Sequence, residues 1–308
     1  MISSNLKPAT ASAIDKQVEK VIRGLGNPEP PLDLHAVREL LALDKKYYST
    51  SADGILREKV SHLTVGMKRI LQKPTLLLTA IRKLDLKALY VPEQRVILLD
   101  DGIPEAKRRW NEAHEIGHSI LEWHGEMLLG DTQITLSPDC HQQIENEANF
   151  AAGRLLFLQE RFGEECLATS LSIKNIKAIS KAFGNSITST LWRVVETIQT
   201  PAVGIVGHHP KYRTPDGESA LRYFVRSPEF EKRFSSVSTE SVLEQVRSYC
   251  SYSRKGPLGM ALVSIRDDRG QEHEFSFETF HNGYDSLTLG IYARPRALLI
   301  QVPHSTAF

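Results

Sequence analysis

Residues 113 to 118 read AHEIGH, a stretch that combines side chains able to bind a divalent metal with one able to move a proton. On a helix, His114 and His118 are about 40° apart in projection and roughly 6 Å apart along the axis. Both imidazoles can therefore reach one ion. Glu115 lies about 100° around the helix from His114, where it can reach a metal-activated water without taking a coordination position. This is the geometry of the HExxH pattern.

A third ligand is expected from ENEANFAAG, residues 145 to 153. A zinc site that does chemistry needs three protein ligands and one open position for water. Glu145 and Glu147 differ by about 200° around a helix, so both cannot face the same ion. We favour Glu145, because Asn149 lies one turn later and could bond the outer nitrogen of a liganding histidine. Glu147 stays as the alternative.

Such a site predicts hydrolysis of a peptide bond with Zn²⁺ as the cofactor. Glu115 would take a proton from the attacking water as general base and give it to the leaving amine as general acid. The simpler alternative is that both stretches are ordinary helices with polar faces and no metal.

The elements that must position these residues can be read from apolar spacing. The pattern predicts a helix over residues 105 to 124 and a second from about 138 to 162, where Ala148, Ala151 and Ala152 permit close helix packing. A helix capped by Asp33 and another near residues 63 to 71 precede them, and KYYSTSADG is expected to form a turn. ALYV and RVILL predict a hairpin joined by PEQ, with RVILL as a candidate edge strand for an extended peptide or as an internal strand.

The rest of the chain predicts a helical pair and then a unit of mixed structure. Residues 171 to 198 resemble a helix-turn-helix, with a turn at Gly184 and Asn185 and a cap at Ser186. Its second helix offers one positive charge, so we favour packing against the catalytic core or holding a protein substrate over direct DNA binding. After residue 200, AVGIVG, MALVSI, HEFSFETF, LTLGIYA and ALLIQV read as strands, and STESVLEQVRSYC reads as a helix.

Five further residues could belong to the site. His124, placed on a continued helix, would lie 240° around from His118, and His141 lies a turn before Glu145, so we expect both at the surface or behind the ligands. His209 and Tyr212, like the neighbouring His208, could supply an oxyanion donor or be solvent-exposed.

Composition limits the other possibilities. The net charge is +1, from 38 basic and 37 acidic residues, so no global field draws the chain to nucleic acid or to an anionic membrane. Three cysteines at irregular spacings favour a reduced compartment. No signal peptide or membrane-length apolar run is present, which predicts a soluble cytoplasmic protein with no membrane partner. Nothing in the sequence specifies an oligomeric state.

AHEIGH followed by E-x-E-A-N-x-F-A-A resembles the ImmA/IrrE family of metallopeptidases over roughly residues 30 to 200. PLDLHAVRELLALD is similar to the family's entry helix, and RRWNEAHEIGH to its R-x-x-x-x-A-H-E-x-G-H run. The chain departs from the family in reading LLFL at residues 155 to 158, where LLMP often closes the second helix. The resemblance implies a bacterial or phage-related peptidase that cleaves a repressor or antitoxin, often in response to stress or DNA damage.

We therefore expect an α+β fold with four parts. They are a helical leader at 1–30, a zincin-like catalytic domain at 31–165, a helix-turn-helix-like segment at 166–200, and a C-terminal α+β sensor or substrate-recognition domain at 201–308. The metal ligands would be His114, His118 and Glu145, with Glu115 catalytic and Asn149 supporting a ligand. The alternative function is a non-catalytic, zinc-stabilised regulatory module that acts on DNA or on a repressor partner.

Overall fold

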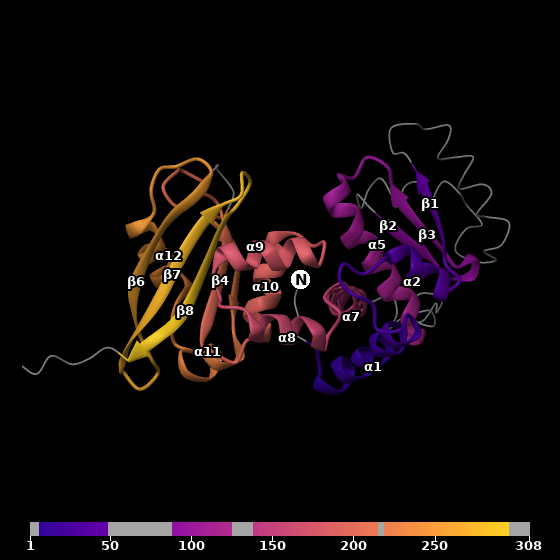
Figure 1. Ribbon diagram of the computed structural model, residues 1–308, viewed down its shortest axis with the longest axis horizontal. Helices are drawn as coiled ribbons and strands as arrows, with labels where there is room; N and C mark the ends of the chain where they lie inside the picture. Colours follow the sequence, from indigo (N-terminus) through magenta and orange to yellow (C-terminus); the bar gives the residue numbers. More distant parts are fainter. Residues whose placement is uncertain (1–5, 49–87, 125–137, 215–218, 296–308) are drawn as a thin grey trace, which may run out of the picture. The chain divides into compact units, whose positions relative to one another are not determined.

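The computed structural model describes residues 6–48, 88–124, 138–214 and 219–295 (Figure 1). Within it the chain forms two compact units. Unit 1 comprises Met1–Phe162 and Ala182–Asn185, and unit 2 comprises Gly163–Lys181 and Ser186–Phe308. Both units combine helices with a sheet, so the fold is α+β as expected.

Unit 1 is built from a small sheet and the helices around it. Its elements in chain order are α1 (Pro8–Gly24), α2 (Leu34–Leu40), β1 (Asp44–Tyr48), β2 (Ala88–Val91), the 3₁₀ turn η1 (Pro92–Gln94), β3 (Val96–Asp100), α5 (Glu105–Ile120) and α7 (Pro138–Leu156). Asp33 caps α2 as predicted, because its side chain accepts a 2.8 Å hydrogen bond from the His35 backbone N–H. The helix predicted near residues 63 to 71 lies outside the described residues.

Among the described residues of unit 1, three strands form a sheet in the order β1-β3-β2. β2 and β3 form the predicted antiparallel hairpin around η1. β1 also pairs with β3, in parallel, where the sequence predicted a turn. Residues 46 to 48 of the predicted turn are therefore strand, because polar DKKYY gains a strand conformation only through its partner, and residues 49 to 54 lie outside the described residues. β3 is therefore an internal strand with all five residues buried, which contradicts its reading as an edge.

The central helix contact of unit 1 is between α5 and α7. α1 packs against α7 through a face that includes buried Ile14, Val18 and Val21. The ion pair between Arg154 and Asp15 adds a polar link between these two helices. The predicted leader thus belongs to unit 1, because the apolar face of α1 is shielded from water only where it packs against α7.

The predicted second helix is interrupted after Leu156. Leu158 and Gln159 have φ angles of 52° and 47°, and the Gln159 N–H bonds back to the Arg154 carbonyl, as in a left-handed helix end. The chain then begins α8 (Glu160–Ala168). LLFL therefore ends the helix without the proline of LLMP.

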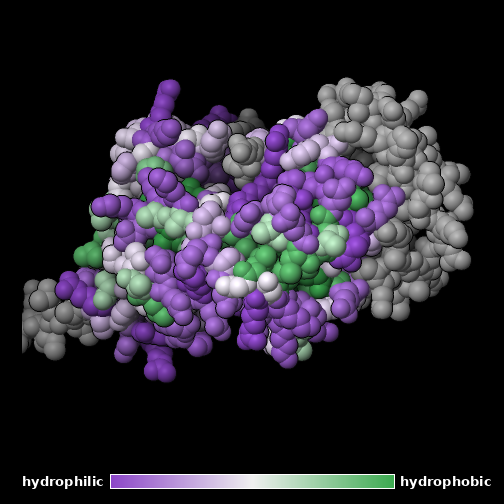
Figure 2. All heavy atoms as spheres, turned by 45° about the vertical axis from the view of Figure 1, so that its right-hand side comes forward, coloured by the Kyte–Doolittle hydropathy of each residue, from purple (hydrophilic) through white to green (hydrophobic). Residues whose placement is uncertain are grey.

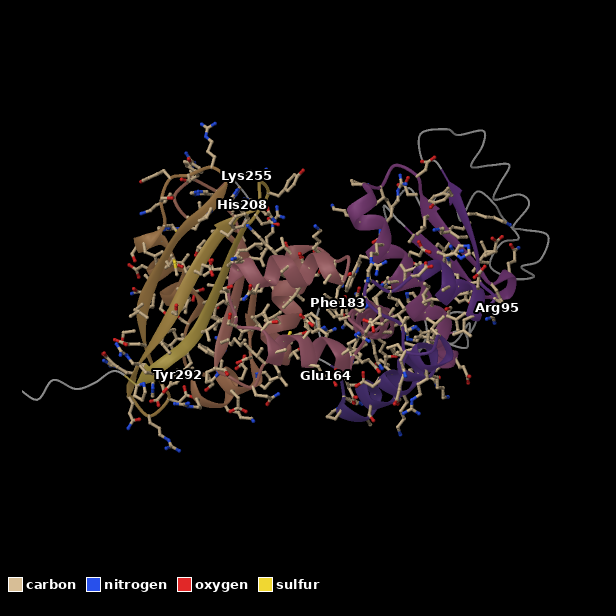
Figure 3. All side chains as sticks on the ribbon, in the orientation of Figure 1. Arg95, Glu164, Phe183, His208, Lys255 and Tyr292 are labelled. Atoms are coloured by element: carbon tan, nitrogen blue, oxygen red, sulfur yellow. The ribbon has the colours of Figure 1, made fainter. Side chains whose placement is uncertain are left out.

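Residues 182 to 185 join unit 1 through an aromatic cluster. The ring centroid of Phe183 lies 5.3 Å from Phe162 and 6.2 Å from Phe157 (Figure 3 labels Phe183). Asn185 donates a 3.2 Å hydrogen bond to the Leu156 carbonyl, and Gly184 supplies the turn with a φ of +65°. The expected boundary at residue 166 therefore differs from the observed division.

The remaining part of the predicted helical segment is formed by α8, α9 (Ile173–Ala182) and α10 (Ile187–Thr197). Ser186 caps α10 as predicted by accepting from the Ser189 N–H. Ser189 and Thr190 are buried, and α10 packs against strands of unit 2. These two polar residues of α10 are thus used inside the unit.

Unit 2 contains a five-stranded antiparallel sheet in the order β5-β4-β8-β7-β6 (Figure 1). Its further elements are β4 (Ala202–Gly207), β5 (Leu221–Arg226), α11 (Pro228–Arg233), α12 (Thr239–Tyr249), β6 (Gly256–Arg266), β7 (Glu272–His281) and β8 (Ser286–Pro295). Four predicted strands and the predicted helix are present, whereas β5 and α11 were missed. The predicted strand at residues 297 to 302 lies outside the described residues.

One core of unit 2 lies where the helices α11 and α12 meet the sheet. It includes buried Phe230 and Phe234, the latter 5.1 Å from the ring of Phe275. Cys166 and Cys250, the cysteines whose side chains the structure describes, are free and buried. Cys250 belongs to this core, where burial raises the pKa of its thiol.

Hydrophilic side chains cover most of the face drawn in Figure 2, with hydrophobic patches between them. Among the described residues, Met260 and Leu262 of β6 are two large apolar side chains that stay exposed. None of the described helices is both long enough and apolar enough to cross a membrane.

Unit 2 should lose stability in mild acid through His281. This ring is nearly buried, and its Nδ1 accepts a hydrogen bond from the Gly283 N–H. Burial lowers the pKa of His281 below 6.5, nearby His209 lowers it further, and Asp285 and the Arg254 backbone oppose the shift. The unfolded chain therefore takes up a proton near pH 6.5 that the folded chain does not, so stability falls as the pH drops through this range.

Denaturant unfolding of the full chain at pH 8 and at pH 5 measures this effect. His281→Gln should lose less stability between these two pH values than the wild type, because its amide can replace both hydrogen bonds but does not titrate. An equal loss in both proteins would contradict the assignment.

Candidate metal centre

His114, His118 and Glu145 converge in unit 1, and we call these three residues the donor triad. His114 and His118 come from α5, and Glu145 comes from α7. The two Nε2 atoms lie 3.2 Å apart, and the Glu145 carboxylate oxygens lie 3.1 Å from His114 Nε2 and 3.5 Å from His118 Nε2. The helix crossing thus brings together the three residues that the sequence singled out.

These separations fit a small divalent ion. Four ligands at about 2.0 to 2.1 Å around a tetrahedral zinc are about 3.3 Å from one another. The two ring nitrogens already have this spacing, and each of them lies at a similar distance from one oxygen of the Glu145 carboxylate. Two nitrogens and one carboxylate oxygen, with a fourth position left for water, form the donor set of catalytic zinc sites. The residues therefore fit zinc, although other divalent ions share these ligands.

The histidines present their Nε2 atoms because their Nδ1 atoms are already engaged. His114 Nδ1 lies 3.1 Å from Asn149 Oδ1, the neighbour expected from the sequence. An amide oxygen only accepts, so His114 Nδ1 carries the proton and Nε2 keeps its lone pair. Asn149 is therefore placed to fix the ring for metal binding.

Glu115 is buried beside the triad, on the side of β2. The pKa of Glu115 is raised to about 7, chiefly by burial. The nearby charge of Glu145 adds to this rise, whereas His114 and a hydrogen bond to the Tyr90 backbone oppose it. A carboxyl with a pKa near neutrality can both take and return a proton. Its environment is thus the one that a general base and acid requires.

The protonation states of His118 and Glu145 also suit a cation. Burial lowers the pKa of His118 to about 4, despite the opposing hydrogen bond to Glu145. Burial opposes ionisation of Glu145, but its hydrogen bonds to His114 and His118 hold its pKa well below the usual range. At neutral pH the site therefore offers a carboxylate and a neutral imidazole to a metal.

Glu147, the alternative third ligand, points elsewhere. It is buried, and its Oε2 accepts hydrogen bonds of 2.6 Å from Trp123 Nε1 and 3.0 Å from His124 Nε2. The position of His124 could not be projected along the helix, because α5 ends at Ile120 and Leu121 is extended with φ −99° and ψ 94°. His124 is fully buried and lies 3.0 Å from His118 Nδ1, behind a ligand.

The other candidates from the sequence do not join the triad in unit 1. His208, His209 and Tyr212 belong to unit 2, where Figure 3 labels His208 near Lys255. His209 Nε2 lies 2.9 Å from the Ser253 carbonyl, and the Tyr212 hydroxyl donates to the Tyr252 carbonyl. The side chain of His141 lies outside the described residues.

Gly117 sets how closely α5 and α7 approach. A Cβ atom at this position would lie 2.8 Å from the Ala148 carbonyl oxygen, which is backbone and cannot rotate away. We expect Gly117→Ala to destabilise the protein by about 1 to 3 kcal/mol through overpacking, against a gain of up to about 1 kcal/mol in helix propensity. It should also weaken zinc binding, because the triad spans this crossing.

Gly163→Ala is the matched control for this substitution. The added Cβ would lie 3.7 Å from Thr197 Cγ2, an ordinary contact, so only the propensity gain should remain. Denaturant unfolding and zinc titration compare the two variants. A Gly117→Ala protein as stable as Gly163→Ala would show that the contact between α5 and α7 accommodates a Cβ atom at this position.

A helix with the HExxH spacing, crossed by a second helix that supplies a carboxylate, defines a metallopeptidase-type centre. Residues 76–194 match the family model Peptidase_M78, described as the IrrE N-terminal-like domain. Residues 76–194 therefore resemble the corresponding domain of the ImmA/IrrE metallopeptidases, and the match concerns this domain.

Two known proteins are similar to this chain. The radiation response metalloprotease IrrE of Deinococcus radiodurans is 25% identical over 198 residues, which cover 62% of this chain and 57% of the relative. The chain thus matches little more than half the length of that relative. A Mycobacterium tuberculosis transcriptional regulator aligns over 94% of this chain and 78% of its own, with 12% identity and a TM-score of 0.49. A likeness at this level establishes neither fold nor function.

Proposed function

We propose that this protein is a zinc-dependent metalloendopeptidase that hydrolyses a peptide bond in a transcriptional repressor or an antitoxin-like regulator. The convergence of His114, His118 and Glu145 beside buried Glu115 carries this proposal. The family match and the name of the Deinococcus relative support the reaction class and a role in stress response. A repressor acts in the cytoplasm, so the proposal places the protein there.

Each residue has a defined part in this reaction. His114, His118 and Glu145 would hold the zinc. Zinc, when bound, polarises a carbonyl oxygen and makes a water more acidic. The Glu115 carboxylate accepts a proton from the attacking water, and it then donates this proton to the leaving amine nitrogen. Burial excludes bulk water from Glu115 and holds its pKa near neutrality, where a carboxyl can both accept and donate a proton.

Strand β2 could present the substrate backbone to this centre. Within the described part of the chain, β2 pairs only with β3. The Tyr90 backbone also forms a hydrogen bond that lowers the pKa of Glu115, so β2 lies beside the catalytic carboxylate. An extended peptide that paired with the other side of β2 would have its backbone next to Glu115.

The test is cleavage of a candidate regulator by the purified full-length protein. The first choice of substrate is the repressor-like protein encoded beside its gene. Zinc-loaded protein should release a new fragment, detected by mass spectrometry, whereas protein stripped by a chelator should not, and added zinc should restore cleavage. Zinc bound without any fragment would support the non-catalytic regulatory module instead. Cleavage by the stripped protein would remove the metal from the mechanism.

A further inference from the structure

A continuous line of buried hydrogen bonds lies behind His118. His118 Nδ1 is 3.0 Å from His124 Nδ1, and His124 Nε2 is 3.0 Å from Glu147 Oε2. His124 and Glu147 are 0% and 1% exposed, so water does not compete for these contacts. Two further donors hold the carboxylate, Trp123 Nε1 at 2.6 Å and Gln143 Nε2 at 2.8 Å.

The proton positions along this line follow from the partners. A carboxylate that receives three N–H donors is an acceptor only, so His124 carries its proton on Nε2. The Nδ1 atom of neutral His124 is then an acceptor, and His118 must donate from Nδ1. His118 Nε2 is left with a lone pair. This is the atom that lies 3.2 Å from His114 Nε2 within the donor triad.

The two liganding histidines are therefore held by different chemistry. Asn149 gives His114 a neutral amide oxygen, whereas His118 is backed by a second imidazole and a buried negative charge. A carboxylate behind a ligand raises its basicity as well as fixing its orientation. His118 should thus be the stronger of the two nitrogen donors.

We infer that Glu147 and His124 form a positioning relay, in which the carboxylate acts through one imidazole to fix the tautomer and rotation of His118 for metal binding. The inference rests on the metal site of the proposed function but not on hydrolysis. Neither residue is part of the donor triad. The relay accounts for two buried polar side chains that the proposed reaction does not otherwise use.

Zinc affinity, measured by competition with a chelator on the purified protein, tests the relay directly. His124→Phe removes the acceptor for His118 Nδ1 and should weaken zinc binding by about 10- to 100-fold. His124→Gln should restore most of the affinity, because its amide can accept from His118 and donate to Glu147. The zinc affinity of Glu147→Gln should lie between those of the two His124 variants, because the NH₂ group of the new amide cannot accept the hydrogen bonds that the carboxylate accepts.

Nitrogen-15 NMR of the histidine rings supplies a readout that a merely structural role would not move. In metal-free wild type, His118 should be protonated on Nδ1, and this tautomer should be lost in His124→Phe and kept in His124→Gln. If His124→Phe does not fold, Glu147→Gln carries the same test. His118 protonated on Nε2 in the wild type would overturn the relay.

His273→Gln is the matched control, because His273 and Asp267 form another buried histidine–carboxylate pair, with 2.9 Å between Nε2 and Oδ2. It should leave zinc affinity and the His118 tautomer unchanged. A folded His124→Phe protein with wild-type zinc affinity would overturn the relay while leaving the metal site intact. A wild type that binds no zinc would overturn both proposals.

Discussion

Glu115→Gln is expected to reduce peptide hydrolysis by about 10²- to 10⁴-fold, the usual contribution of a general acid–base group. Glutamine has nearly the same shape, but its amide cannot take a proton from water. Zinc binding should remain intact, because Glu115 is not one of the three donors that converge in the structure. Activity and metal content should therefore separate in this one variant.

The measurement is the rate of fragment formation beside the zinc content of the same preparation. Glu122→Gln is the control, because Glu122 is an exposed carboxylate that follows the same helix and should not affect the rate. Wild-type hydrolysis by Glu115→Gln would remove Glu115 from the reaction. Loss of zinc together with activity would instead make Glu115 part of the metal site.

Glu145→Gln is expected to weaken zinc binding by more than about 100-fold, beyond the effect of losing an outer partner of a ligand. The substitution removes the negative charge that offsets the charge of the cation, and it leaves two imidazoles alone. The folded state should be little affected, since the side chain is 52% exposed. Hydrolysis should fall with zinc occupancy.

Chelator competition and metal analysis after dialysis check this result. Glu39→Gln is a matched control, because Glu39 forms an exposed pair with His35, with 3.5 Å between Oε2 and Nδ1. It should bind zinc as the wild type does. A Glu145→Gln protein with wild-type affinity would exclude Glu145 as a ligand and direct attention to groups outside the triad.

Local patterns predicted a large part of the fold. The apolar spacing of α5 and α7, the cap at Asp33 and the β2–β3 hairpin depend on residues close together in the chain. Strands such as β4 could be predicted because their sequence is a continuous apolar run, and all positions of β4 are indeed buried. β1 was missed because its polar residues become strand only beside β3, a partner far away in the sequence.

The errors near the site have a similar origin. Helical projection placed His124 far from His118, but the helix stops at Ile120 and the chain folds His124 back under the ligand. Glu147 was weighed only as a ligand, because its partners Trp123 and His124 come from another element. Helical spacing does not relate positions on the two sides of the helix end at Ile120.

The sequence by itself determined which side chains could hold a metal, since a separation of four residues places His114 and His118 on one face of any helix. It also narrowed the third ligand to two carboxylates. Only the tertiary structure decided between them, because the close approach of α5 and α7 at Gly117 brings Glu145 to the two rings and buries Glu147 behind them. Periodicity fixes directions along one helix, whereas packing fixes the distance between two.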